Sequence, residues 1–130
     1  MNYLTAKQLE KIALTQGGVT FRAHGPNQFE VEVFAEGYQV ALTDNKVIGD
    51  LWVSLNMIHE AVSNDLHVFK TGIFGLYWSD IRKSWYLDQS VLILCENDAH
   101  TLAYACRQET IFNWVSCECE QVSPQLACGV

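Results

Sequence analysis

The chain has 130 residues, 49% of them hydrophobic, and its 15 acidic and 8 basic side chains give a formal net charge of −7. This length and hydrophobic content are typical of one ordinary domain with its own core, so we expect a single domain over residues 1–130, with residues 121–130 as a frayed tail. Phosphate backbones need clustered Lys and Arg, which this chain lacks, and we therefore expect no direct binding to nucleic acid.

The longest apolar runs, such as Val91–Cys95, fall far short of the roughly 20 residues that cross a bilayer, so no membrane association is expected. The first 18 residues are polar every few positions and lack the basic start and apolar block of a secretory signal. A cytoplasmic location follows as the expectation. An odd number of cysteines spoils a closed disulfide framework, so we expect free thiols at Cys95, Cys106, Cys117, Cys119 and Cys128.

The N-terminal segment predicts a helix over Thr5–Gln16. Thr5 and Gln8 have the spacing of a capping box, in which each side chain accepts the backbone N–H of the other residue. Apolar residues then recur on one helical face until Gly17 and Gly18 end the run.

Three short strand patterns follow, separated by turn-rich segments: Val19–Ala23, Gln28–Phe34 and Tyr38–Leu42. Their succession predicts an antiparallel meander with one packed face and one solvated face. Arg22, Glu30 and Glu32 fall on the solvated face, where Arg22 can pair with either glutamate. The alternation assigns these side chains to the packed face: Val19, Phe21, Ala23, Phe29, Val31, Val33, Tyr38, Val40 and Leu42.

The middle of the chain predicts a second helix, a hairpin and a long strand. Asp50 is a suitable N-cap for a helix over Asp50–Ser63, whose apolar residues fall at helical spacing. Leu66–Lys70 and Ile73–Trp78 are apolar and aromatic runs split by a glycine turn, which predicts another hairpin. Trp85–Cys95 predicts a long strand whose end is apolar on both faces, and this suits a central position in the sheet.

A further helix of about ten residues is expected after the long strand, with Asn97 or Asp98 as its cap. Its apolar stripe comprises Ala99, Leu102, Ala103 and Cys106. Thr110–Val115 then predicts a last strand, so that the chain ends in a strand–helix–strand unit, right-handed where its two strands pair. The expected fold class is α+β: an antiparallel sheet of about six strands packed by two or three helices.

The last 50 or so residues carry a pattern of aromatic, acidic and alanine positions at Trp78-Ser-Asp80, Lys83–Asp88, Asp98-Ala99, Leu102-Ala103 and Gln108–Trp114. This pattern resembles one found in small uncharacterised proteins encoded by phages and other mobile elements. The resemblance implies an accessory protein that binds and blocks a host system. Most matched positions are core or turn positions, so no functional residue is carried over from it. The chain departs from the pattern at Cys117-x-Cys119, where a polar turn is usual.

Cysteine and histidine chemistry finds little support in the spacing. Cys117, Cys119 and Cys128 are fewer than the four ligands of a structural zinc site, so we expect neither a metal nor a cofactor. His100 and Cys106 are six residues apart on one expected helix and fall on different faces, which argues against a thiol nucleophile. His24 lies in a turn, and His59 and His67 have no cysteine nearby in the sequence. The phosphate-loop, dinucleotide-binding and zinc-protease motifs are all missing from the sequence.

Two carboxylate pairs, Glu30 with Glu32 and Glu118 with Glu120, each share one side of an expected strand and are interpreted as solvated faces. Trp78 and Trp85 flank an expected hairpin turn and would contact each other across it. Tyr77 and Trp78 are our candidates for aromatic anchors of a protein partner. Other aromatic side chains are assigned to the core.

The acidic charge lies mostly in the last third of the chain, since residues 84–130 hold six acids and only Arg107 as a base. We therefore expect a non-enzymatic protein that binds a partner with a basic surface, for example an anti-CRISPR-like inhibitor of a host defence or DNA-handling complex. The acidic contacts would be Asp88, Glu96, Asp98, Glu109, Glu118 and Glu120. The alternative is a small enzyme or small-molecule-binding protein with a pocket between the helices and the sheet. A homodimer is compatible with either hypothesis.

Overall fold

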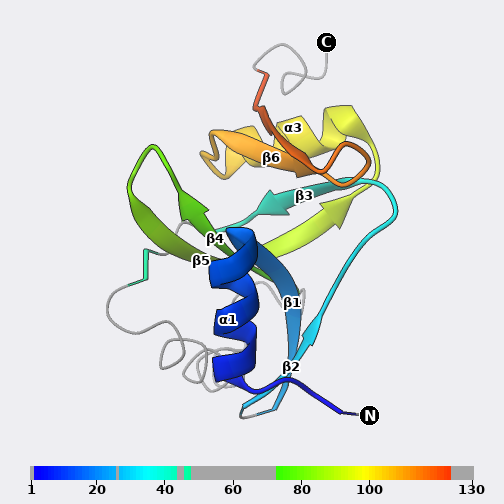
Figure 1. The fold of residues 1–130 in the computed structure, drawn as a ribbon. Helices are drawn as coiled ribbons and strands as arrows, with labels where there is room; N and C mark the ends of the chain where they lie inside the picture. Colours follow the sequence, from blue (N-terminus) through cyan, green and yellow to red (C-terminus); the bar gives the residue numbers. More distant parts are fainter. Residues whose placement is uncertain (1, 26, 44–45, 48–72, 124–130) are drawn as a thin grey trace.

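The computed structural model describes residues 2–25, 27–43, 46–47 and 73–123 (Figure 1). The expected helix at Asp50–Ser63 and strand at Leu66–Lys70 lie outside these residues, as does most of the tail. The helices and strands of the described part follow in the order α1 (Ala6–Gln16), β1 (Gly18–Gly25), β2 (Gln28–Val31), β3 (Tyr38–Ala41), β4 (Ile73–Ser79), β5 (Ser84–Ile93), α3 (Glu96–Ala105), β6 (Thr110–Asn113) and β7 (Glu118–Gln121). Neither of these two helices is long and apolar enough to span a membrane.

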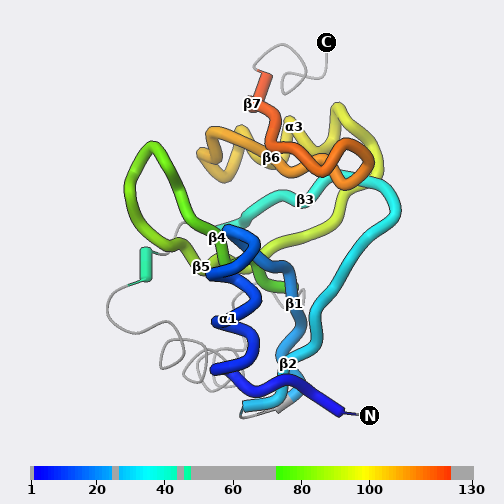
Figure 2. The backbone as a smooth tube through the Cα atoms, in the orientation of Figure 1, coloured from blue at the N-terminus to red at the C-terminus, as the bar shows by residue number. Residues whose placement is uncertain are grey.

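The strands form one antiparallel sheet of seven strands in the order β2-β1-β4-β5-β3-β6-β7. The expected α+β class and antiparallel sheet are thus confirmed, with seven strands in place of about six. The predicted meander is wrong, because β3 pairs with β5 and β6 and not with β2. After β2 the chain leaves this edge and runs across to the other part of the sheet, as the cyan segment of Figure 2 shows. There Val40 pairs with Val91 and reaches the core beneath α3.

The predicted strand–helix–strand ending is confirmed only in the order of its elements. β5, α3 and β6 follow one another, but β3 lies between β5 and β6, and β7 adds a terminal hairpin. The helix begins at Glu96 after Cys95, whose side chain makes no capping bond, so neither Asn97 nor Asp98 is the cap. Glu96 and Asp98 instead lie in the first turn, where the helix dipole favours negative charge.

The predicted boundaries of α1 are confirmed by its two ends. Thr5 and Gln8 form the reciprocal capping box, and Gly17 ends the helix with a φ of 81°, a left-handed conformation that favours glycine. Ala6, Leu9 and Ala13 are buried against the sheet.

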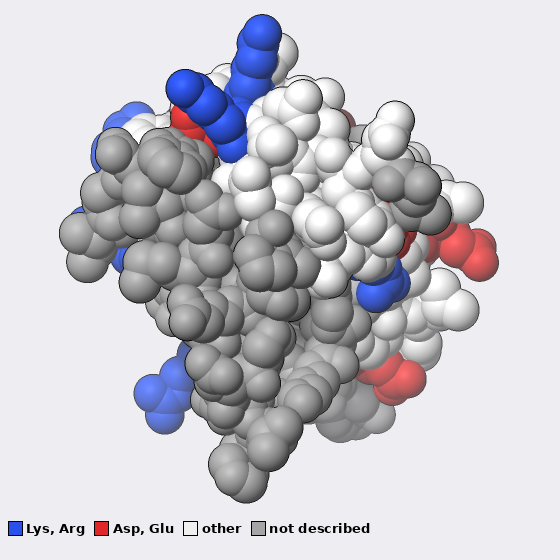
Figure 3. All heavy atoms as spheres, turned by 90° about the horizontal axis from the view of Figure 1, so that it is seen from below, with Lys and Arg blue, Asp and Glu red and all other residues white. Residues whose placement is uncertain are grey.

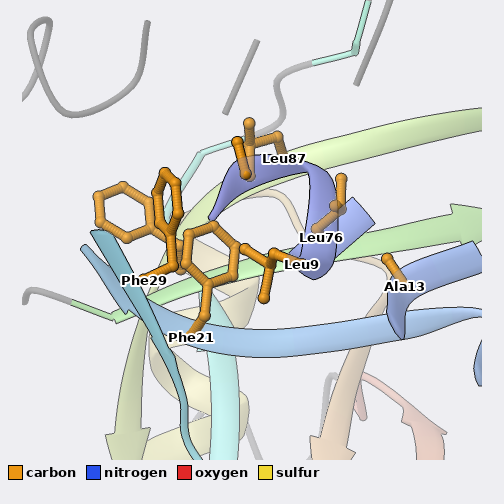
Figure 4. Close-up of a cluster of buried hydrophobic side chains, with 8 residues drawn as sticks. Leu9, Ala13, Phe21, Phe29, Leu76 and Leu87 are labelled. Carbon is orange, nitrogen blue, oxygen red and sulfur yellow. The ribbon is translucent and has the colours of Figure 1, made fainter. Parts of the chain in front are cut away.

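Two apolar clusters hold the helices on the same face of the sheet. In the first, Leu9 and its neighbours on α1 pack with Phe21, Phe29, Leu76 and Leu87 (Figure 4). The second lies under α3 and comprises Val40, Ala99, Ala103 and Ile111, with Val91 and other half-buried residues around them. Leu87 and Val91 are four residues apart on β5 and therefore point the same way, which places α1 and α3 on one side of the sheet.

The predicted faces of the N-terminal strands are partly correct. Phe21 and Phe29 are buried as expected, and Arg22 forms an ion pair with Glu32. Val33, in contrast, is 76% exposed, because β2 ends at Val31 and the alternation does not continue into the crossing segment.

The sheet is strongly curled. The hydroxyl of Thr20 on β1 donates to Oε1 of Gln39 on β3 at 2.8 Å, although β4 and β5 lie between these two strands. In a flat sheet, three strand spacings would put their backbones about 14 Å apart. The curl thus folds the face of the sheet opposite α1 and α3 towards itself.

We predict that Phe21→Ala lowers the free energy of unfolding by about 3–5 kcal/mol, because it removes a fully buried ring that packs against Phe29 and Phe74. Urea denaturation followed by circular dichroism measures this loss. The control, Val33→Ala at an exposed position, should change the same free energy by no more than about 0.5 kcal/mol. Equal effects of the two substitutions would contradict this assignment of the core.

Candidate functional site

The curled face of the sheet, opposite α1 and α3, encloses a groove of about 490 Å³ that is lined by residues of all seven described strands. Its lining is mixed: Thr20, Gln39 and Ser90 contribute polar atoms, while Phe112 and Trp114 contribute aromatic surface. The groove lies on the side of the sheet opposite α1 and α3, whereas the alternative hypothesis placed a pocket between the helices and the sheet.

Gln39 is the polar centre of this groove. It is only 8% exposed, and its Oε1 accepts hydrogen bonds from the Thr20 hydroxyl at 2.8 Å and from Nε1 of Trp114 at 3.2 Å. Gly75 on β4 leaves room for the other end of the amide, since a Cβ there would lie 3.2 Å from Gln39 Nε2. Strand alternation puts Gln39 on the face opposite Tyr38 and Val40, and it gives no sign that the sheet curls to bury that face.

Asp88 lies on the same face as the groove, but it is buried and does not belong to an exposed acidic surface. Asp88 is only 1% exposed, and its carboxylate accepts hydrogen bonds from the Tyr77 hydroxyl at 3.0 Å and from the Thr43 hydroxyl at 3.3 Å. Its removal from the surface follows from strand pairing, because Tyr77 lies on β4 and Thr43 comes just after β3, the two strands that flank β5. Asp88 was predicted as a partner contact, but its burial and its hydrogen bonds give it a structural role within the sheet.

The two predicted aromatic anchors differ in their surroundings. Trp78 is 38% exposed and contacts Trp85 edge to face, with ring centroids 5.8 Å apart, so the predicted contact across the hairpin is present. Tyr77 is half-buried, stacks on Tyr86 and uses its hydroxyl on Asp88. Their role in binding a partner stays a prediction.

The cysteines of the described residues are free, and they form no group with other metal-ligating side chains of this part of the chain. Cys117 lies in the turn between β6 and β7 with a φ of 57°, and Cys119 follows on β7. Both line the groove. Cys128 lies outside the described residues, as do His59 and His67.

A second polar site lies on the other face, where α3 packs against the C-terminal hairpin. Glu96 and His100 are one turn apart on α3, and Glu120 on β7 reaches the same point. One ligand atom from each residue lies within 4.8 Å of the others. These three residues are called the carboxylate–histidine cluster below.

His100 is the most informative member of the cluster. It is 2% exposed, and its Nδ1 accepts the backbone N–H of Ser123 at 2.9 Å. The proton of the neutral imidazole therefore lies on Nε2. This Nε2 is buried and has no hydrogen-bond partner among the described residues; Oε1 of Glu96 is 4.0 Å away.

The two carboxylates of the cluster lack a compensating cation. No Lys or Arg of the described residues pairs with Glu96 or Glu120, although Asn113 donates to Oε2 of Glu120. These charges also act on Tyr38 on β3. Burial, together with the negative charges of Glu96 and Glu120, raises the pKa of the Tyr38 hydroxyl. The cluster thus concentrates two negative charges around one buried imidazole.

The remaining predicted acidic residues surround the cluster or lie apart from it. Asp98 is exposed in the first turn of α3, and Glu118 is exposed on β7, two residues from Glu120. Glu109 precedes β6 and forms an ion pair with Arg82 at 3.7 Å. The surplus of acidic residues is evident from the sequence. The contact of Glu120 with α3 is not, because it depends on tertiary packing. The spacing of Glu96 and His100, one helical turn, was the local signal that could have revealed part of the cluster.

No protein-family model, curated protein or solved structure matches this chain. The resemblance to proteins of phages and mobile elements therefore stays an expectation from the sequence pattern. Function has to be inferred from the geometry and charge of the two sites themselves.

We predict that Gln39→Met lowers the free energy of unfolding by roughly 2–4 kcal/mol, because the Thr20 hydroxyl and the Trp114 indole both lose their acceptor. Urea unfolding followed by tryptophan fluorescence measures the change. Gln16→Met, a matched substitution at an exposed position of α1, should have little effect. A Gln39 variant as stable as the Gln16 variant would show that the curl does not depend on this amide.

Proposed function

We propose that this protein is a non-enzymatic binding protein that docks an acidic surface onto a basic surface of a protein partner. The surface consists of Glu96 and Asp98 on α3 with Glu118 and Glu120 on β7, and is called the α3–β7 acidic surface. The observation that carries the proposal is that Glu96 of α3 and Glu120 of β7 come together, with Asp98 and Glu118 exposed on the same two elements. No Lys or Arg of the described residues pairs with any of these four carboxylates.

The stability of the fold accounts for only two of the four carboxylates of this surface, Glu96 and Asp98. The dipole of α3 favours Glu96 and Asp98, because they lie in its uncapped first turn. It offers no such benefit to Glu118 and Glu120 on β7, which add like charge beside them. A partner that supplies Lys or Arg would relieve this repulsion on binding.

The opposite end of the molecule has a different character. Figure 3, which views the molecule from below and thus from the end remote from α3, shows Lys and Arg side chains as well as Asp and Glu at separate points around that face. The described residues of this face thus carry charges of both signs, whereas the carboxylates of the α3–β7 acidic surface have no paired Lys or Arg among the described residues.

The biological setting of this binding is proposed from the sequence pattern at Trp78–Trp114. An accessory protein of a mobile element that blocks a host defence or DNA-handling complex would meet a basic surface there, because such complexes bind phosphate backbones with Lys and Arg. An acidic surface is suited to cover such a groove.

A second candidate function is the binding of a small molecule in the groove around Gln39. A volume of about 490 Å³ falls within the range of small-molecule sites, and the combination of aromatic walls with a few polar atoms is typical of them. The described lining residues of the groove include the thiols of Cys117 and Cys119 but no histidine that could act as a base for them, and this does not favour catalysis. Non-enzymatic binding is therefore the proposal for both candidates.

We predict that Glu118→Lys weakens capture of the partner from host lysate by about tenfold at low salt, because one reversed charge within a Debye length of a basic surface costs about 1.4 kcal/mol or more. Captured protein is quantified by mass spectrometry at rising salt. Affinity for the unmodified chain should fall as salt rises.

The matched control is Glu30→Lys, a partly exposed glutamate on β2, which lies at the opposite edge of the sheet from β7, with the same change in net charge. It should bind as the unmodified protein does. Equal losses in the two variants, or binding unchanged from low to high salt, would contradict docking through the α3–β7 acidic surface.

A further inference from the structure

His100 presents a buried nitrogen to a pair of carboxylates, and this arrangement has no structural role that the described residues explain. A buried polar atom without a hydrogen-bond partner lowers the stability of a fold by about 1–3 kcal/mol. Such an atom therefore calls for an explanation other than stability of the fold. Nε2 of His100 is such an atom, and it faces Oε1 of Glu96 at a distance of 4.0 Å, too long for a hydrogen bond.

We propose that Glu96, His100 and Glu120 bind a divalent transition-metal cation of the Zn²⁺ class. One imidazole nitrogen and two carboxylate oxygens are a ligand set that Zn²⁺ and its first-row neighbours accept, whereas Ca²⁺ and Mg²⁺ prefer oxygen alone. Three protein ligands leave a fourth position for water or for a group of a partner.

The present distances are compatible with this site after a small closure. Metal–ligand bonds of about 2.0–2.1 Å in a tetrahedral site put neighbouring ligand atoms about 3.4 Å apart. The three atoms now lie within 4.8 Å of one another, so the ligand atoms must approach one another by up to about 1.4 Å. Glu96 is about half exposed and Glu120 is half-buried, and both side chains can rotate to make this movement.

The hydrogen bond from Ser123 sets a condition on metal binding. Nε2 can offer its lone pair only in the tautomer that carries the proton on Nδ1. In that tautomer Nδ1–H would face the Ser123 N–H, which is 2.9 Å away in the metal-free state, and two donors repel. The cation and the Ser123 contact therefore exclude each other, and binding of the metal releases the backbone at Ser123 from α3.

This inference is independent of the proposed docking function, because it concerns the affinity of the free protein for a metal ion. The test is calorimetric titration of the full chain, without a histidine tag, with ZnCl₂. We expect one Zn²⁺ per chain, and Glu120→Gln and Glu96→Gln should each weaken binding by at least about tenfold, since loss of second-shell partners alone costs about 10–100-fold. These partly exposed positions avoid the risk that a His100 variant fails to fold.

Two controls separate this site from others. Glu118→Gln removes a carboxylate of the same strand that is not part of the cluster, and its affinity for Zn²⁺ should equal that of the unmodified chain. The variant C117S/C119S/C128S should also bind normally. Zinc that is lost with the thiols but kept in Glu120→Gln, or no stoichiometric binding at all, would overturn the proposal.

A spectroscopic readout tests the link to the tail. On addition of ZnCl₂ the backbone amide resonance of Ser123 should shift, and its hydrogen exchange should become faster, because its acceptor on His100 is lost. In Glu120→Gln the same resonance should stay in place. An amide of Ser123 that remains protected while Zn²⁺ is bound would show that His100 is not a ligand.

Discussion

The hydrogen bond between Thr20 and Gln39 is the contact on which the shape of the sheet depends. It joins β1 to β3 across two intervening strands, and Trp114 on the far side of β3 shares the same acceptor oxygen. Gly75, halfway along the curl, leaves space for the amide above β4. One buried amide thus connects three parts of a sheet whose strands come from distant parts of the chain.

The curl also determines which surfaces of the protein are available. It encloses the polar groove on its inner side and leaves α1 and α3 on the outer side, where they cover separate apolar clusters. Because α3 covers β3 and β6, its first two turns come next to β7, and Glu120 meets Glu96 and His100 there. The carboxylate–histidine cluster is therefore a consequence of the strand order.

The sequence predicts the local elements well and their arrangement less well. The capping box at Thr5, the glycine at position 17 and the alternation in β1, β4 and β5 are local signals, and the structure contains the corresponding elements. Strand order is not a local property. The segment after Val31 carries no feature that distinguishes a tight return to β2 from a crossing to β5, so the meander was the simplest expectation.

The two polar sites could not be predicted from the sequence, again because they depend on contacts between distant segments of the chain. Gln39 alternates with apolar residues as a solvent-facing residue would, and only the curl buries it. Asp88 was counted among exposed acids, although hydroxyl groups from two other segments accompany it in the interior. For His100, the neighbour that matters is twenty residues away on β7, and no spacing within α3 reveals it. Burial of polar residues in this chain follows from tertiary contacts that periodicity does not encode.

The proposed metal binding and the proposed docking of a partner use two of the same carboxylates. The two binding events are therefore antagonistic. A divalent ion held by Glu96 and Glu120 cancels two of the four negative charges on the α3–β7 acidic surface and lowers its attraction for a basic partner. A Lys or Arg placed between the same oxygens excludes the ion. Because coupling between two ligands is reciprocal, the factor by which Zn²⁺ weakens the partner must equal the factor by which the partner weakens Zn²⁺. Asp98 and Glu118 lie outside the cluster, and their attraction for the partner persists when the metal is bound. Occupancy by a metal would thus reduce docking in degree and leave its direction unchanged.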